Sequence, residues 1–297
     1  MGYGYNNFGR LFFDQGDLVR AYENLINARN IFEKLDDKSG LAYVYRSLAG
    51  LYSSQGDNEK ALESSKQALE LRRKIGDARG ILSALMELGL VYNDVGLSKN
   101  AVSSLQEATA IASSISDEIS LAEISLALSE IYVEGNIIQD ALAEAKNAYA
   151  TIVRNDNKRM LARANLQMGI CQYLMRDYYA ALQYLTVALN ESERSQNLSI
   201  SRDANLYLGK VYEMRNDLSR AAQFTNKYLV LKESLQNVDL TRQIERLQFQ
   251  LEIEKKEKEN DLLTAKEEVA KSTIQQKELQ NIFLIVVVSF VSLLAGV

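Results

Sequence analysis

A unit of 40 residues is repeated six times along the chain without any change of register. Each unit carries a small residue at one position, which we call the anchor: Gly9, Ala49, Gly89, Ser129, Gly169 and Gly209. Twelve residues after every anchor stands an alanine: Ala21, Ala61, Ala101, Ala141, Ala181 and Ala221. A fixed period of this length is typical of proteins whose repeats stack side by side. It therefore predicts a stacked array rather than a compact globule.

Each unit is predicted to form two antiparallel helices. In the first helix, apolar residues such as Leu48 and Tyr52 recur four residues apart, which is the spacing of one helix face. The second helix places small residues such as Ala61 on one face, so that the two backbones can approach closely. An aromatic three residues after most anchors is expected to fill the gap between the helices. These aromatics are Phe12, Tyr52, Tyr92, Tyr132 and Tyr212, and Gln172 takes their place in one unit.

Short polar turns separate the predicted helices. Glycine or asparagine supplies the left-handed residue that ends the first helix, and Asp, Asn or Ser is expected to cap the second. The six turns carry Gly16-Asp17, Gly56-Asp57, Gly96-Leu97-Ser98, Gly135-Asn136, Arg176-Asp177 and Asn216-Asp217. Proline is absent from the chain, which fits long helices joined by short turns.

The pattern resembles the tetratricopeptide repeat (TPR), whose hallmark is a small residue, an aromatic three positions later and alanines at the spacing above. The stretch LGLVYNDVGLSKNAVSSLQEA (88–108) is an example. The usual TPR has about 34 residues, so these units resemble a longer variant, and they lack the usual tryptophan and late proline. The resemblance implies an all-α, TPR-type α-solenoid over residues 1–237. Its repeats are expected at about 2–41, 42–81, 82–121, 122–161, 162–201 and 202–237.

Residues 238–281 are predicted to form a long charged helix. Leu240, Ile244, Leu247 and Leu251 keep the 4-3-4 spacing of a coiled-coil seam, which Leu262, Ala265, Val269 and Leu279 resume less regularly. The pairs Glu252–Lys256 and Glu254–Lys258 place an acid four residues before a base, which supports an exposed helix. Two interpretations remain open: a coiled coil that pairs two copies into a homodimer, and a single solvated helix.

The segment 282–297 is apolar and contains no charged residue. A membrane-spanning helix needs about 20 such residues. The segment is therefore expected to be a transmembrane helix that continues beyond Val297, and the alternative is a short hydrophobic tail. No signal peptide is visible after Met1, and read literally the sequence allows a cytoplasmic array with a tail anchor.

Composition argues against several functions. A net charge of −5 and a pI near 5.2 disfavour a nucleic-acid binder, which needs a basic face. The chain has no histidine and a single cysteine, Cys171, so the commonest general base and metal ligand are missing and no intramolecular disulfide can form. We find no catalytic constellation and therefore expect no enzyme activity, no cofactor and no metal site within these residues.

The resemblance to TPR proteins implies binding on a concave surface lined by the outward positions of the first helices. The mixture of aromatic residues and arginine there suits an extended peptide or a partner helix. The candidate residues are Tyr3, Asn6, Arg10, Phe13, Tyr43, Arg46, Met86, Asn93, Glu130, Tyr173 and Lys210.

The order of TPR array, charged helix and apolar segment resembles the sensory half of bacterial membrane receptors. In such receptors a histidine kinase, a diguanylate cyclase or a helix-turn-helix regulator follows the span. The resemblance implies a single-pass membrane sensor with its array in the periplasm, in which the long helix relays ligand binding to an output domain. The alternative is a membrane-tethered assembly scaffold without signalling output.

Overall fold

The computed structural model describes residues 1–236 and 247–256, and single helical positions at 258, 262, 266, 271, 273, 274 and 277. The described residues form α-helices and no strand, which confirms the all-helical prediction. The chain divides into two units, Met1–Gln243 and Ile244–Val297, and each is described by itself. The predicted boundary at 237/238 falls between the described ranges.

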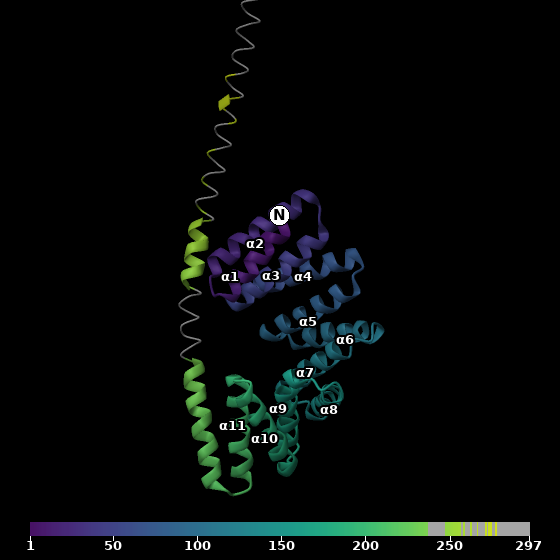
Figure 1. Cartoon of the computed structure of the whole chain (residues 1–297), viewed down its shortest axis with the longest axis vertical. Coiled ribbons are helices and arrows are strands. Elements are labelled where there is room, and N and C mark those ends of the chain that lie inside the picture. Colours follow the sequence, from purple (N-terminus) through teal and green to yellow (C-terminus); the bar gives the residue numbers. More distant parts are fainter. Residues whose placement is uncertain are drawn as a thin grey trace, which may run out of the picture. The chain divides into compact units, whose positions relative to one another are not determined.

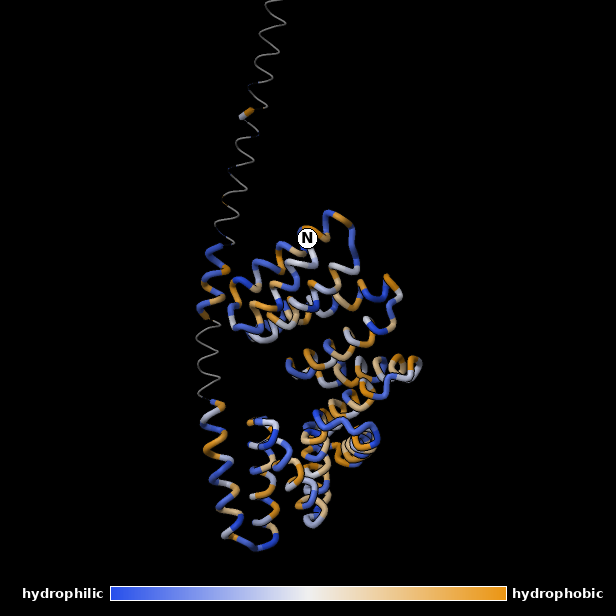
Figure 2. The backbone as a smooth tube through the Cα atoms, in the orientation of Figure 1, coloured by the Kyte–Doolittle hydropathy of each residue, from blue (hydrophilic) through white to orange (hydrophobic). Residues whose placement is uncertain are grey.

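The helices of the first unit come in antiparallel pairs that stack along the chain (Figure 1). The first helices of the pairs are α1 (Gly2–Asp14), α3 (Lys38–Ser54), α5 (Ala78–Asp94), α7 (Glu118–Glu134), α9 (Lys158–Leu174) and α11 (Leu198–Met214). The second helices are α2 (Leu18–Leu35), α4 (Asn58–Ile75), α6 (Ser98–Ser114), α8 (Ile138–Arg154), α10 (Tyr178–Arg194) and a helix over 218–236. Apolar and polar residues alternate around these helices, as Figure 2 shows. The structure is the predicted helix-pair solenoid.

The anchors allow the two helices of a pair to pack closely. The size of each anchor matches that of the residue opposite it on the second helix. A methyl group added at Gly89 would lie 2.9 Å from Leu105 of the second helix, and one at Gly169 would lie 2.6 Å from Leu185. Where the anchor has a side chain, the residue sixteen positions later is small instead, as in the pair Ala49 and Ser65. The small space between the two helices is therefore filled in one of two ways: by a large side chain opposite a glycine, or by two small side chains opposite each other.

The hydrophobic core crosses the boundaries between neighbouring pairs. Buried Leu69 of α4, Leu82 of α5, Leu105 of α6 and Leu128 of α7 belong to one cluster. No pair buries its apolar face alone, which is the physical basis of a stacked repeat.

The turns within the pairs follow the prediction at the residue that ends the first helix. Gly16, Gly56 and Gly96 have φ of 80°, 66° and 75°, and asparagine takes this conformation at Asn136 with φ of 57°. Arg176 adopts it as well, with φ of 65°, although its side chain makes the left-handed region less favourable.

The predicted caps are confirmed in some turns and wrong in two. Asp57 accepts a hydrogen bond from the Lys60 amide at 3.2 Å, and Asp17 and Asp177 cap their helices in the same way. The N-cap residues of α6 and α8, however, are Leu97 and Ile137, whose side chains cannot cap. Ser98 lies one residue too late, and Asn136 one residue too early because it occupies the left-handed position.

Replacing Leu97 or Ile137 by aspartate is expected to raise the free energy of unfolding by about 1 kcal/mol each. The backbone at Leu97 (φ −90°, ψ 57°) is close to that of the capped Asp17 (φ −84°, ψ 80°), so the new carboxylate can reach the helix amides. Urea denaturation of the variants measures the change. Asp57→Ala serves as the matched control and should lose about the same amount; unchanged midpoints for both aspartate variants would contradict the prediction.

The second unit is described over a short helix at 247–256 and the single positions beyond it. Lys258 pairs with Glu254 at 2.6 Å and Lys256 with Glu252 at 3.9 Å, which confirms both predicted pairs. Of the predicted seam, Leu247, Leu251 and Leu262 are exposed. The other seam residues, Leu240, Ile244, Ala265, Val269 and Leu279, lie outside the described residues, so the coiled coil stays a prediction.

Among the residues that the structure describes, no helix is long and apolar enough to cross a membrane. The segment 282–297 lies outside the described residues. The transmembrane helix therefore stays a prediction from the sequence.

Candidate functional site

The first helices form the inner side of the stack. Helix α1 packs on α3, α5 on α7, α7 on α9 and α9 on α11, whereas the second helices make their main contacts with first helices. Elements on the inner side of a curved stack lie closer together, so the free faces of the first helices line its concave surface. Helices α3 and α5 are the neighbouring first helices that pack least closely.

A pocket of about 420 Å³ lies where α1, α3 and α5 meet on this surface. Its floor is made of the buried residues Asn6, Gly9, Leu25, Ala49, Ser65 and Val91. Its rim carries the exposed or half-buried residues Arg10, Phe13, Asp14, Tyr43, Arg46, Ser47, Gly50, Ser53, Glu87, Leu90 and Asp94. The pocket thus combines aromatic and aliphatic walls with charges of both signs.

The polar groups of the floor are only partly satisfied. Ser47 donates a hydrogen bond to the Asn6 side-chain oxygen at 3.1 Å. The Ser65 hydroxyl is buried and has no hydrogen-bond partner in the described part of the chain. A buried polar group without a partner is uncommon in a folded protein and is a reason to look for a ligand.

The charges on the rim are unevenly paired. The Arg46 guanidinium binds the Glu87 carboxylate at 2.6 Å. Burial raises the pKa of the Glu87 carboxyl above its ordinary value, and Arg46 offsets part of that rise. Partial burial and the negative charge of Glu134 raise the pKa of the Asp94 carboxyl, which has no cationic partner among the described residues.

Tyr43 is held in place from behind. The Arg72 guanidinium lies 4.3 Å from the centre of its ring and binds Asp77 at 2.9 Å. Arg72 is 8% exposed, so its side chain is committed to this contact. The Tyr3 ring meets Tyr43 edge-on at 6.3 Å, and its hydroxyl donates to Asp37 at 3.2 Å. These contacts fix one wall of the pocket.

Two further hollows continue the pocket along the concave surface. One of about 310 Å³ is lined by Tyr43, Arg46, Arg72 and Glu87 among others. Another of about 410 Å³ includes Arg46, Met86 and Glu123, and so extends to α7. Together they make a groove that crosses α1, α3, α5 and the start of α7.

The structure brings together five of the predicted site residues. The pocket is lined by Asn6, Arg10, Phe13, Tyr43 and Arg46. Met86 lines the neighbouring hollow, and Tyr3 supports Tyr43 from the side. The set as a whole stays a prediction, because contact with a partner is what would test it.

The remaining predicted residues are not among those that line these hollows. Asn93 donates to Glu134 at 3.4 Å, and Glu130 binds Arg163 through two contacts of 2.6 and 2.7 Å. Tyr173 packs edge-on against Tyr207 at 5.5 Å, and Lys210 lies 4.8 Å from the same ring. Asn93, Glu130 and Tyr173 are thus engaged with neighbouring helices, and Lys210 with a residue of its own helix, α11.

Sequence reasoning missed several residues of the pocket, chiefly Asp14, Gly50, Leu90 and Asp94. A usable signal was present, because each lies four or eight residues after a predicted site residue on the same helix face. Asp14 follows Arg10, Gly50 follows Arg46, and Leu90 and Asp94 follow Met86.

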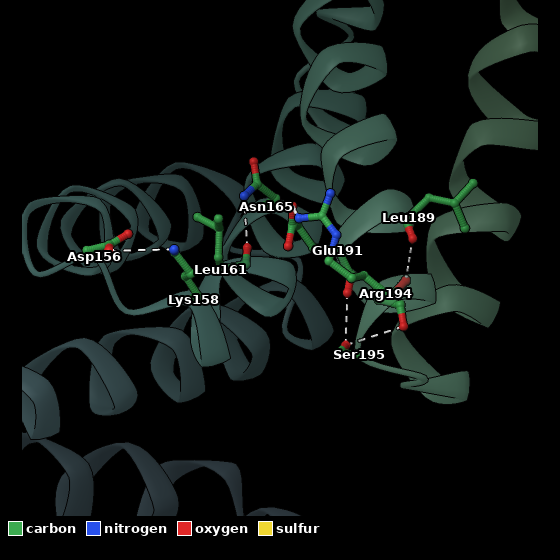
Figure 3. A network of polar contacts seen from close by, with 9 residues as sticks. Asp156, Lys158, Leu161, Asn165, Leu189, Glu191, Arg194 and Ser195 are labelled. Atoms are coloured by element: carbon green, nitrogen blue, oxygen red, sulfur yellow. Dashed lines mark hydrogen bonds and ion pairs between the residues drawn. The ribbon is translucent and has the colours of Figure 1, made fainter.

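Some polar residues elsewhere in the array are satisfied within their own helices, although single side-chain atoms of Arg29, Gln55, Asn93 and Asn205 are, like the Ser65 hydroxyl, buried without a hydrogen-bond partner among the described residues. Figure 3 shows such a network near the ends of α8–α10, where Ser195 donates to the Glu191 carbonyl at 2.9 Å and Arg194 pairs with the Glu191 side chain at 3.0 Å. Asn165 likewise donates to the Leu161 carbonyl at 2.8 Å. These bonds lie within single helices, whereas Arg46 and Glu87 on the rim of the pocket pair across α3 and α5.

Comparison with known proteins agrees with this architecture. Residues 2–74 match the sequence profile of the tetratricopeptide repeat. The solenoid is TPR-like. Residues 81–135 match a second profile, described as anaphase-promoting complex subunit 5. A search of curated proteins gives no match to the chain.

Solved structures share the TPR-like fold at low sequence identity. The apo form of RapI is 11% identical, with a TM-score of 0.64 over 80% of this chain and 99% of RapI. A signal-transduction ATPase with a TPR sensor, PH0952 from Pyrococcus horikoshii, is 17% identical, with a TM-score of 0.67 over 81% of this chain and 38% of that protein. NprR in complex with its cognate peptide NprX is 16% identical, with a TM-score of 0.59 over 84% of this chain and 70% of NprR. At these identities the likeness shows the fold alone.

Proposed function

We propose that this TPR-like array binds a peptide or an extended segment of a protein in the groove across α1, α3 and α5. The observation that carries the proposal is the pocket itself, which gathers Asn6, Phe13, Tyr43 and Arg46 from two first helices. Aromatic residues and arginine are enriched at sites that dominate protein binding energies. The fold neighbour NprR was solved with a peptide, which supports the same use of this fold.

The chemistry of the groove suits an extended chain. Hydrogen-bonding side chains lie beside apolar walls, so that backbone amides and side chains of a ligand can be satisfied together. A volume of about 420 Å³ lies within the range of small ligand pockets and holds one or two side chains. The adjoining hollows would take the flanking residues.

Blocking the pocket at Gly50 tests this proposal. Gly50 is exposed on the rim, and a Cβ atom added there meets no atom within 4 Å, so we expect Gly50→Trp to fold and to place its ring in the groove. We expect peptide binding to weaken by at least about tenfold, which is about 1.4 kcal/mol. Fluorescence anisotropy with peptides selected on the wild-type chain measures the loss.

Gly4→Trp is the matched control, since Gly4 is equally open, lies on α1 and is not among the residues that line the pocket. It should bind as the wild type does. Equal binding by both variants would place the ligand elsewhere.

We further propose that the chain is a membrane-attached sensor module, in which the helix following the last repeat carries the effect of binding to an output domain. The sequence supports this through the run of helix-forming residues from 238 to 281 and the apolar segment 282–297. A periplasmic array, pairing of two helices 238–281 and a single membrane span belong to the same proposal.

Alkaline extraction of membranes tests the attachment. The full chain should stay in the membrane pellet, and a chain ending at residue 281 should be released. Helix-breaking prolines near Lys258 then distinguish a relay from a scaffold in a protein that carries an output domain. Loss of the response supports the relay, and an unchanged response favours a tethered scaffold.

A further inference from the structure

The C-terminal ends of three first helices carry an unfavourable charge. Asp14, Asp94 and Glu134 are the last residues of α1, α5 and α7, and none of these helices has a basic residue in its last turn. A helix C-terminus is itself partially negative, so an acidic residue there is disfavoured. Four second helices, α2, α4, α8 and α10, follow the usual rule instead, with Lys34, Arg72, Arg73, Lys74, Arg154 and Arg194 in their last turns, and α6 has neither a basic nor an acidic residue there.

Two of these carboxylates, Asp14 and Asp94, line the pocket. Neither has an ion pair or hydrogen bond with another described residue, whereas Glu87 is neutralised by Arg46. Partial burial raises the pKa of the Asp94 carboxyl, and the negative charge of Glu134 adds to that rise. The pocket thus has three carboxylates against the two guanidiniums of Arg10 and Arg46, and its excess charge is negative.

A second observation on the same pocket also points to a ligand. Ser65, on the floor, is 4% exposed, and its hydroxyl has no partner in the described structure. An acidic residue at a helix C-terminus and a buried hydroxyl without a partner are both unfavourable. Uncompensated features of this kind are expected at functional sites, where a ligand supplies the missing partner. Here the missing partners are a positive charge at the rim and a polar group at the floor.

We propose that the pocket binds a lysine or arginine side chain of the peptide, with its cationic head facing Asp14 and Asp94. The inference rests on the proposed peptide-binding function and names its specificity. The methylene stem lies against Phe13 and Leu90, which a metal ion would leave uncovered. The charge of the peptide relieves the repulsion that the empty site carries.

Selection of random displayed peptides on the full wild-type chain tests the inference. Lysine or arginine should be enriched at one position. Replacing that residue by norleucine or citrulline, which keep the stem and remove the charge, should weaken binding by about three- to tenfold in anisotropy measurements. The difference should shrink when the NaCl concentration is raised from about 50 to about 500 mM.

Asp94→Asn separates this role from a structural one. The variant should lose most of the preference for lysine over norleucine, while its Tm stays the same or rises because the helix end is relieved of charge. Asp36→Asn is the matched control: Asp36 is exposed, ends α2 in the left-handed conformation that asparagine also accepts, and is not among the residues that line the pocket. It should keep the wild-type preference.

The outcomes are distinguishable. Selected peptides without an enriched basic residue, or an unchanged preference in Asp94→Asn, would overturn the inference and leave peptide binding standing. A wild-type chain that selects no peptide at all would overturn the proposed function and this inference together.

Discussion

Replacing Leu185 by alanine is expected to lower the free energy of unfolding by about 2–5 kcal/mol. Leu185 is fully buried in the core shared by α9, α10 and α11. Its side chain sits directly over the anchor Gly169, where an added methyl group would lie 2.6 Å away. Truncation to alanine therefore removes apolar contacts and leaves a cavity between α9 and α10, because the surrounding structure relaxes only in part.

The same contact predicts strong coupling between the two positions. Gly169→Ala should cost about 1–3 kcal/mol, because its methyl group meets both the Leu185 side chain and the Leu185 backbone nitrogen at 3.2 Å. In the double variant the new methyl occupies part of the vacated space, as in the natural pair Ala49 and Ser65. The double loss should fall short of the sum by at least about 1 kcal/mol.

Urea denaturation of the two single variants and the double variant gives this coupling energy. Gly4→Ala is the control, because a methyl group there meets nothing within 4 Å and should leave stability unchanged or raise it by up to about 1 kcal/mol. Additive losses at 169 and 185 would show that the size match of the repeats has no energetic role.

Phe32→Ala is expected to cost about 3–5 kcal/mol at the junction of the first two pairs. Phe32 is 2% exposed and packs against Gly2 and Gly40, whose missing side chains make room for its ring. Its ring also meets Tyr3 edge-on at 4.7 Å. One aromatic side chain thus joins α2 to both neighbouring first helices.

The effect should be local, because a solenoid is held together mainly by contacts between adjacent repeats. Hydrogen exchange should therefore speed up in α1–α3 more than in α9–α11. Phe8→Ala is the matched control on α1, since Phe8 is 55% exposed, and should change stability by less than about 0.5 kcal/mol. Equal losses for both phenylalanines would contradict the packing shown here.

The helix pairs could be predicted because their cause is local and repeated. Anchors, aromatics and turn residues recur every 40 positions. The pattern of one unit alone would be weak evidence, but six units with the same pattern support one another. The aromatic Tyr212 indeed stacks on Phe224 of the second helix of its own pair at 5.4 Å, whereas Tyr52 meets Tyr22 of the preceding pair. The caps at Leu97 and Ile137 were predicted wrongly because a shift of one residue decides whether a side chain can cap.

The candidate site was predictable only in part. The resemblance to TPR proteins implied that the outward positions of the first helices line a binding surface, and so predicted Asn6, Arg10 and Tyr43 as candidates together with residues such as Glu130. The structure shows that Glu130 is bound to Arg163, while Asp14 and Asp94 have no such partner among the residues that the structure describes. Pairing across helices is invisible in a repeat pattern, because it depends on side chains that are 33 positions apart or more.

The sequence by itself determined that the described chain is helical, that its helices come in pairs and where most of them end, because these properties follow from spacings within about 40 residues. Only the tertiary structure decided which repeats open into a pocket and which charges remain unpaired there. The spacing of α3 and α5 and the charges around Asp94 depend on how whole helices pack. How whole helices pack depends on many contacts between residues that are far apart in the sequence, so no single stretch of the sequence determines it.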